Sequence, residues 1–317
     1  MPISSKKVLF LLAAPCVALG GCSVTVGSTN GDAGSDAAPT TTGTDSGTTL
    51  ADAGGAGADD GASADGGASA EAGKLGFVPS NLPSGMALAA PGDWVFSSQR
   101  CGGRTTVQID TSKGTSDCDG KAAPYQYSAI TQSDMSLGSL QAAVFVTNKF
   151  TVETGMQVTV VGNLPLIVVA LGDANISGIL SATVNDVSSD KANGGGASGG
   201  PHNANGSGPG GGTAPVGASG AGGGAFCGMG GDGPGVGDAG AMGGKTYGAA
   251  TNVPLVGGSA GGSGSYGAGG GGGGAIQIAS ASSIQVTAIG AINVAGGGGN
   301  WSRSGGGSGG AILLQAP

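Results

Sequence analysis

The tract from Asn193 to Gly274 limits the fold most, because it consists largely of steps such as Gly-Gly-Gly and Gly-Pro-Gly. Glycine makes up 73 of the 317 residues, against roughly 7% in an average protein. Glycine loses more conformational freedom on folding than any other residue, so ordered structure is expected here only where neighbouring strands clamp the chain. We interpret residues 193–273 as a low-complexity excursion from a folded unit, with Val253-Pro-Leu-Val-Gly-Gly-Ser as its best segment for docking on that unit.

Short apolar runs on both sides of the tract predict an all-β fold. Residues 76–192 contain β-branched runs such as Leu166-Ile-Val-Val-Ala, about eight residues apart and separated by Gly, Asn and Pro. In residues 274–317, Gly274-Ala-Ile-Gln-Ile-Ala and Gly310-Ala-Ile-Leu-Leu-Gln match at an offset of 36. Each run is too short to form a core alone, so the runs must stack. We predict a right-handed parallel β-helix, a solenoid with a long glycine-rich excursion; a β-sandwich is the alternative.

The amino end has the layout of an export signal. Two lysines precede an apolar stretch from Val8 to Leu19, which is too short to span a bilayer as a stable helix. The stretch ends in Leu-Gly-Gly-Cys22, which resembles the bacterial lipobox, where small residues admit a peptidase and the cysteine carries lipid. We predict that residues 1–21 are a lipoprotein signal peptide and that Cys22 is the lipid attachment site. Conventional cleavage a few residues earlier, leaving a soluble secreted protein, is the alternative.

The segment that follows, residues 22–75, is expected to be a disordered tether. Ala, Gly, Asp, Ser and Thr dominate it, and Leu50 is the only large aliphatic residue between Val26 and Ala72. Such a segment buries too little surface to offset its conformational entropy. Removal of residues 1–21 takes away two lysines, which moves the formal charge from −8 to −10. An acidic chain repels nucleic acid, so no nucleic-acid partner is predicted.

The remaining cysteines favour one disulfide. Cys101 and Cys118 close a short loop in the part of the sequence that predicts a compact fold, and we predict a bond between them in an oxidising compartment. Cys227 would then be unpaired in the glycine tract. We predict no metal site, because the three cysteines lie far apart and the single histidine, His202, is surrounded by Pro, Asn and Gly.

Two glycine-rich motifs match known patterns only in part. Ala239-Gly-Ala-Met-Gly-Gly-Lys-Thr satisfies a relaxed phosphate-loop pattern, but the strand before and the helix after are missing. Gly230-Gly-Asp-Gly-Pro-Gly-Val-Gly-Asp is similar to a calcium-binding nonapeptide, with Gly235 where an Asp is required. Both matches are expected by chance in a glycine tract, so no cofactor is predicted.

Four charged residues are candidates for a catalytic role. Several β-helix proteins cleave polysaccharides with clustered Asp and Lys side chains, so Asp173, Asp186, Asp190 and Lys191 form the set to examine. Acid and base catalysis needs two carboxylates that face one cleft, and solvated loop charges are the commoner case. No catalytic residue is therefore assigned.

The succession of motifs resembles one known family. The resemblance rests on the lipobox, the tether, Phe77-Val-Pro-Ser-Asn, the Cys101 to Cys118 loop, Leu164-Pro-Leu-Ile-Val-Val-Ala, Val253-Pro-Leu-Val and Gly-Gly-Ala-Ile-Leu-Leu. Together these are similar to the uncharacterised glycine-rich cell-surface lipoproteins of myxobacteria; similarity to mycobacterial glycine-rich surface proteins is compositional. The resemblance implies a lipid-anchored location at the outer membrane or cell surface and a β-rich repeat architecture, and it carries over no catalytic residue.

We therefore expect a non-enzymatic surface lipoprotein with a structural, adhesive or matrix-contact role. Its partners would be the membrane, through the lipid on Cys22, and extracellular polysaccharide or matrix. A polysaccharide-binding or polysaccharide-cleaving β-helix protein is the alternative. The last predicted repeat, which begins at Gly310, has no cap, so we expect an exposed strand edge through which the chain can form an oligomer.

Overall fold

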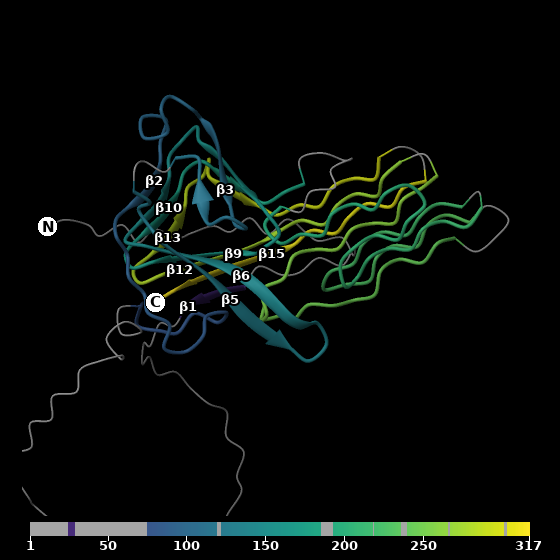
Figure 1. The fold of residues 1–317 in the computed structure, drawn as a ribbon, viewed down its shortest axis with the longest axis horizontal. Helices are drawn as coiled ribbons and strands as arrows, with labels where there is room; N and C mark the ends of the chain where they lie inside the picture. The colour runs from purple at the N-terminus through teal and green to yellow at the C-terminus, as the bar shows by residue number, and fades with distance from the viewer. Residues whose placement is uncertain are drawn as a thin grey trace, which may run out of the picture.

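The computed structural model describes residues 25–28, 75–118, 122–184, 193–217, 219–235, 240–265, 267–300 and 303–317. Its regular elements are β-strands, which confirms the predicted all-β class. The strands gather in one region, and glycine-rich segments extend from it to one side (Figure 1). No helix among the described residues is long and apolar enough to cross a bilayer.

The largest sheet has six strands and is buried on both faces at its centre. In order across the sheet they are β1 (Thr25–Ser28), β15 (Ala311–Ala316), β12 (Ala275–Ser280), β9 (Leu166–Ala170), β6 (Gly138–Thr147) and β5 (Gln126–Asp134). Neighbours are parallel except for β5 and β6, which form an antiparallel hairpin. Every residue of β9 is fully buried. Its unbroken Leu-Ile-Val-Val-Ala run suits a parallel strand covered on both sides.

Two smaller sheets complete the strand body. One contains, in order, β13 (Ile284–Val286), β10 (Ala174–Ile176), β7 (Phe150–Val152) and β2 (Trp94–Phe96). The other contains β14 (Ala291–Asn293), β11 (Ile179–Ser181), β8 (Gln157–Val161), β3 (Thr106–Asp110) and β4 (Thr115–Ser116). Only β3 and β4 are antiparallel. From β6 to β15, consecutive strands enter different sheets, so that β10, β11 and β12 pair in parallel with β7, β8 and β9 respectively.

Two hydrophobic clusters hold these sheets. The first draws side chains from all three sheets and contains an aromatic group around Trp94, whose ring lies 4.5 Å from that of Tyr125 and 5.1 Å from that of Phe145. Such pairs contribute about 0.5–1.5 kcal/mol each beyond the burial of their area. The second cluster covers the other face of the six-stranded sheet, where Leu82 and Leu255 pack against strands β6 and β9.

The predicted right-handed parallel β-helix is wrong. The strands form three sheets, two of which contain an antiparallel pair, and a solenoid of uniform repeats is not found in the described part of the chain. A β-sandwich, the alternative, is compatible with these sheets. Apolar runs predict strands, but turn chemistry decides which edges pair. In the β5–β6 turn, Asp134 Oδ1 accepts hydrogen bonds from the amides of Ser136, at 2.7 Å, and Leu137, at 2.9 Å, which reverses the chain.

The glycine-rich segments form a hydrogen-bonded bundle, which we call the glycine bundle and define as the described residues between 193 and 310 that lie outside the strands. Successive amides in it point to different neighbouring segments. The amides of residues 222, 223, 224 and 225 donate to the carbonyl oxygens of Thr213, Gly231, Gly306 and Gly210. The amides of residues 222 and 225, three positions apart, thus both donate to the segment of residues 210–213. The same spacing of three recurs where the amides of Gly258 and Gly261 donate to the carbonyl oxygens of Gly273 and Gly270. A period of three is that of an extended polyproline II helix, which makes no hydrogen bonds within itself.

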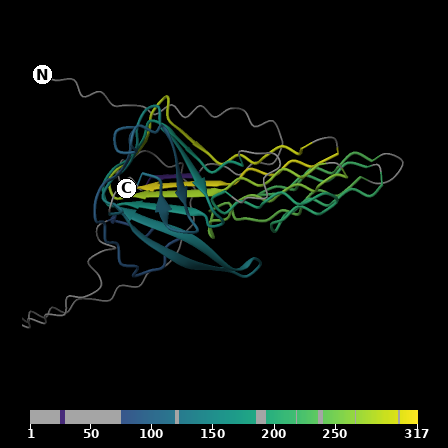
Figure 2. The ribbon, with the colours of Figure 1, turned by 45° about the horizontal axis from the view of Figure 1, so that its top comes forward.

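Glycine is required in this bundle because the segments lie too close for side chains. A Cβ atom built on Gly222 would lie closer than 3.0 Å to the carbonyl oxygen of Met242, and one on Gly262 would meet that of Thr213 in the same way. Backbone atoms fixed by hydrogen bonds cannot retreat as a side chain can. The tract is therefore an interlocked structure that extends from the sheets, as a view turned by 45° also shows (Figure 2).

Candidate functional site

Five of the residues singled out for chemistry lie outside the described residues. These are Cys22, Asp186, Asp190, Lys191 and Asp238. Their roles stay predictions. Within the described residues, no group of three or more His, Cys, Asp or Glu side chains is placed to hold a metal ion.

Cys101 and Cys118 form a disulfide, with their Cα atoms 4.6 Å apart. Cys101 is 2% exposed and packs in the first hydrophobic cluster beside Trp94. Arg104 Nε donates to the Cys101 carbonyl oxygen at 3.0 Å. Cys227 is disulfide-bonded too, in contrast to the unpaired thiol expected from the sequence.

Asp173 serves as a hydrogen-bond acceptor between two turns. Its Oδ1 accepts from the hydroxyls of Ser282, at 2.7 Å, and Ser283, at 2.8 Å. The bond from Ser282 and then that from Ser283 lower the pKa of this exposed carboxyl, so Asp173 is ionised at neutral pH. Because Asp173 Oδ1 already accepts both serine hydroxyls, it links the start of β10 to the turn before β13. This is a structural role.

The glycine motifs use their polar groups within the bundle. In the segment similar to a phosphate loop, the amide of Gly243 donates to Asp232 Oδ1 at 2.7 Å, and that of Gly244 donates to the Gly223 carbonyl oxygen. Phosphate binding needs free backbone amides. Asp232, an acid of the nonapeptide-like motif, is the acceptor in one of these bonds. The structure thus gives both motifs a packing role.

A cavity of about 500 Å³ lies where the glycine bundle meets the six-stranded sheet. Its walls are Ser139–Gln141, Asn163–Pro165, residues 195–198 and 207–209, Tyr247 and residues 255–258. None of these side chains is charged. The volume is within the range of small-molecule sites, and the mixture of apolar, hydroxyl and amide groups suits a neutral ligand.

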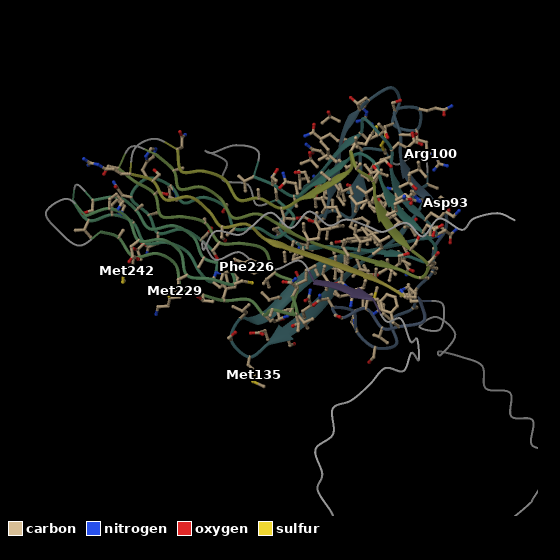
Figure 3. All side chains as sticks on the ribbon, turned by 180° about the vertical axis from the view of Figure 1, so that it is seen from behind. Asp93, Arg100, Met135, Phe226, Met229 and Met242 are labelled. Atoms are coloured by element: carbon tan, nitrogen blue, oxygen red, sulfur yellow. A yellow bond between two sulfur atoms is a disulfide. The ribbon has the colours of Figure 1, made fainter. Side chains whose placement is uncertain are left out.

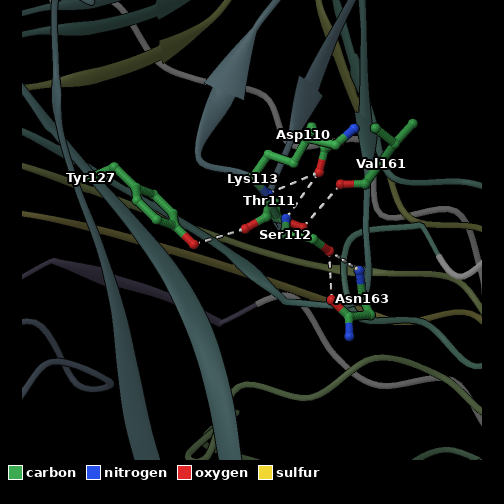
Figure 4. Close-up of polar contacts among 7 residues, drawn as sticks. All are labelled: Asp110, Thr111, Ser112, Lys113, Tyr127, Val161 and Asn163. Atoms are coloured by element: carbon green, nitrogen blue, oxygen red, sulfur yellow. Dashed lines mark hydrogen bonds and ion pairs between the residues drawn. The ribbon is translucent and has the colours of Figure 1, made fainter.

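Asn163 is held at the edge of this cavity by a polar cluster at the end of β3 (Figure 4). Ser112 Oγ donates to Asn163 Oδ1 at 2.5 Å and accepts from the Asn163 amide at 3.0 Å. Asp110 fixes the turn, since its carboxylate accepts from the Ser112 amide and from Lys113 Nζ, the latter at 2.7 Å. Burial alone would raise the pKa of Asp110, but the hydrogen bonds and charge of Lys113 outweigh it and lower the pKa. Tyr127 closes the cluster through a bond from its hydroxyl to the Thr111 carbonyl oxygen.

Tyr247 supplies the aromatic wall of the same cavity. Its hydroxyl donates to the Gly257 carbonyl oxygen at 2.6 Å and accepts from Ser259 Oγ at 2.9 Å. Burial raises its pKa to about 12, so the phenol is neutral at every physiological pH. The ring packs edge-on against Phe226, with 5.3 Å between centroids. Tyr247 therefore offers a fixed apolar surface, with its hydroxyl already bonded.

A second cavity, of about 220 Å³, lies beside β5. Its lining residues are Ser80–Pro83, Thr131–Ser133, Val253 and Pro254. Segment 253–258 thus lines both cavities, which gives the docking segment predicted from the sequence a place between them. Asn81 and Gln132 are 5% and 8% exposed. No motif pointed to these two amides, because their burial depends on contacts between distant parts of the chain.

Comparisons with known proteins add no identity. No family model, no curated protein and no solved structure matches this chain.

Proposed function

We propose that this protein is a non-enzymatic, lipid-anchored protein of the bacterial outer membrane or cell surface that acts by contact with matrix or other surfaces. The observation that supports this most is the glycine bundle, in which backbone hydrogen bonds and glycine-only contacts join segments from residue 194 to residue 310. Such a bundle is a stiff projection held largely by its backbone. Because β1 begins three residues after Cys22 and pairs with β15, a lipid on Cys22 would hold the six-stranded sheet next to the membrane, and the glycine bundle would project from that sheet.

The exposed surface of the bundle suits contact through apolar groups. Side chains crowd the sheets but are sparse on the bundle, where Met229 and Met242 point outward (Figure 3). They are 79% and 66% exposed, and Met135 at the tip of the β5–β6 hairpin is fully exposed. Methionine is flexible and polarisable, which suits surfaces that adapt to different partners.

Polysaccharide binding is the second candidate function, and the uncharged cavity of about 500 Å³ favours it. Tyr247 offers a ring face, and Asn163, Gln141 and Ser139 offer hydrogen-bonding groups to a neutral sugar. Glycan-array binding by the purified chain would support this role. Reducing-sugar release would instead point to cleavage.

The edge expected to be uncapped belongs to β15, and β1 pairs with it, so it is not open. We propose instead a second copy of the chain as a partner, bound at the open edges of β13 and β14. Ile284 on β13 pairs with Ala174 on β10, and Ile292 on β14 pairs with Leu180 on β11. The inner members are fully buried, whereas the outer ones are only half-buried although they pack on the same core. The open edges therefore present aliphatic side chains and strand backbone that another strand can cover.

Two features favour a two-fold contact in which the edges of β13 and β14 in one copy pack against the same edges in a second copy. On β2, at the opposite edge, Trp94 and Phe96 are fully buried, so that side offers no matching apolar surface. Between Val26 and Ala72 the same chain has Leu50 as its only large aliphatic residue. A two-fold contact uses one surface twice and needs no further partner.

The anchor is tested on intact cells that express the full chain. Protease shaving followed by mass spectrometry of the amino-terminal peptide should yield lipid-modified Cys22, and Cys22→Ala should release the protein into the medium. Unmodified Cys22 at the mature amino end would refute the anchor. Contact is tested by adhesion of the same cells to extracellular matrix before and after shaving. Unchanged adhesion would contradict the contact role.

A further inference from the structure

The smaller cavity contains a donor and an acceptor without partners. Asn81 Oδ1 and Gln132 Nε2 are buried and make no hydrogen bond in the structure. Buried polar atoms are almost always paired with protein or with water, so two such atoms on side chains that line one cavity need an explanation. A ligand that donates to one and accepts from the other would supply it.

The hydrogen-bond network fixes which atom of each amide is left over. Asn81 Nδ2 donates to the Asn252 carbonyl oxygen and to Gln277 Oε1, both at 2.9 Å. Gln277 Nε2 in turn donates to Gln315 Oε1 at 2.8 Å, so Gln277 cannot be turned over without losing both bonds. On the other side, Gln132 Oε1 accepts from the Leu255 amide at 2.8 Å. The free atoms are therefore an oxygen acceptor on Asn81 and a nitrogen donor on Gln132.

The remaining walls describe the rest of the ligand. Leu82, Pro83, Val253 and Pro254 supply apolar surface, and none of the lining side chains is charged. Ser80 places a hydroxyl among the exposed lining residues. A secondary amide has one N–H and one C=O, and an acetyl methyl beside it suits an apolar wall. The cavity has room for about one sugar ring, whose hydroxyls would meet that of Ser80.

We propose that this cavity binds the N-acetyl group of an N-acetylated amino sugar. Both free atoms are closed to solvent in the unliganded structure, so binding requires the cavity walls to open slightly. The amide N–H of the sugar then donates to Asn81 Oδ1, its carbonyl oxygen accepts from Gln132 Nε2, and its methyl packs on Leu82 and Pro254. This site is separate from the lipid anchor and from the larger cavity, so its failure leaves both of the functions proposed above standing. Free peptide segments present the same amide and are the competing occupant.

The test measures binding to the purified full chain by calorimetry and by saturation-transfer NMR. The probes are N-acetylglucosamine and its β-1,4 disaccharide, with glucosamine and glucose as sugars that lack the acetyl group and N-acetylalanine methylamide as the peptide probe. We expect the strongest saturation at the acetyl methyl, and about tenfold weaker binding of the sugars without it. Binding of the peptide probe but not of the sugars would overturn the sugar assignment. Absence of binding by every probe would overturn the site.

Gln132→Glu separates recognition from folding. The carboxylate keeps an oxygen for the Leu255 amide but replaces the Nε2 donor by an acceptor, so binding at neutral pH should fall about tenfold. Protonation of the buried carboxyl at acid pH restores a donor, and binding should recover there, which a merely structural defect would not allow. The control is Gln126→Glu on the same strand, where the side-chain oxygen likewise accepts a backbone amide, from Ala89, at a site outside the cavity.

Val253→Trp keeps the test decisive if Gln132→Glu fails to fold. Val253 is 40% exposed, lies outside the strands and lines the cavity, so a large ring there can occupy the cavity. We expect loss of acetyl-sugar binding with an unchanged melting temperature. Unchanged binding in both variants would overturn the proposal.

Discussion

The interlocked packing of the glycine bundle predicts a large cost for the smallest possible substitution. In Gly222→Ala the new methyl would overlap the backbone of Met242 and Gly243. Relief requires movement of that segment, which strains the bonds from the Thr213 amide to the Met242 carbonyl oxygen and from the Gly244 amide to the Gly223 carbonyl oxygen, both 2.9 Å. Overpacking costs about 1–3 kcal/mol and each weakened bond about 1 kcal/mol. The reduced entropy of the unfolded chain offsets about 0.4–1 kcal/mol. The net loss of unfolding free energy is about 2–4 kcal/mol.

The matched control is Gly231→Ala in the same bundle. A Cβ there meets nothing within 4 Å, and the residue does not have a positive φ. We expect this variant to be unchanged or stabilised by up to about 1 kcal/mol. Urea denaturation gives the global free energy, and amide hydrogen exchange of residues 240–245 and 256–264 shows whether the loss falls on the bundle. Equal stability and equal exchange in the two variants would refute interlocked packing.

Four further predictions follow from described contacts. Reduction or Cys118→Ser should remove about 3 kcal/mol of unfolding free energy, from a loop with a sequence separation of 17; an unchanged urea midpoint would contradict this. Folding lowers the pKa of Asp110, so its carboxylate stabilises the fold above the unfolded pKa of about 3.9, and this stabilisation is lost as the pH falls through the folded pKa. Asp110→Asn should therefore lower the free energy of unfolding at pH 7 and make that free energy fall less in acid. Parallel curves of unfolding free energy against pH for the variant and the wild type would contradict this. Cleavage before Cys22 removes Cys16, so in the mature chain Cys227 can bond only to Cys22 or to a second copy of the chain; with lipid on Cys22, non-reducing peptide mapping should find Cys227 linked between two chains, and a cross-link to Cys22 would refute the lipid anchor. Ile292→Lys should abolish a dimer seen by analytical ultracentrifugation while Ile179→Lys, whose side chain is exposed on β11, should not; a monomeric wild-type chain would refute the edge contact.

The candidate site was only partly predictable from the sequence. The segment from Val253 was singled out by its apolar residues within a glycine tract, and it lines both cavities. Asn81 and Gln132 carry no local signal, because an amide becomes a buried, partly unpaired group only when distant segments cover it. The same holds for Tyr247, whose pKa is raised by burial against the chain around Gly257.

The sequence by itself determined where strands form, since runs such as Leu166-Ile-Val-Val-Ala suit only a strand buried on both faces, and it determined which residues are available for a lipid or a disulfide. It did not determine which strand edges pair, because the Asp134 turn and the neighbours of β3 choose antiparallel partners that apolar spacing does not encode. Nor did it determine the order of the glycine tract. Glycine composition allows both a loose loop and a close-packed bundle, and only the contacts of Gly222 with segments far away in the chain favour the second. Glycine's lack of a side chain makes the chain costly to order, and it also permits the close backbone approach that offsets this cost.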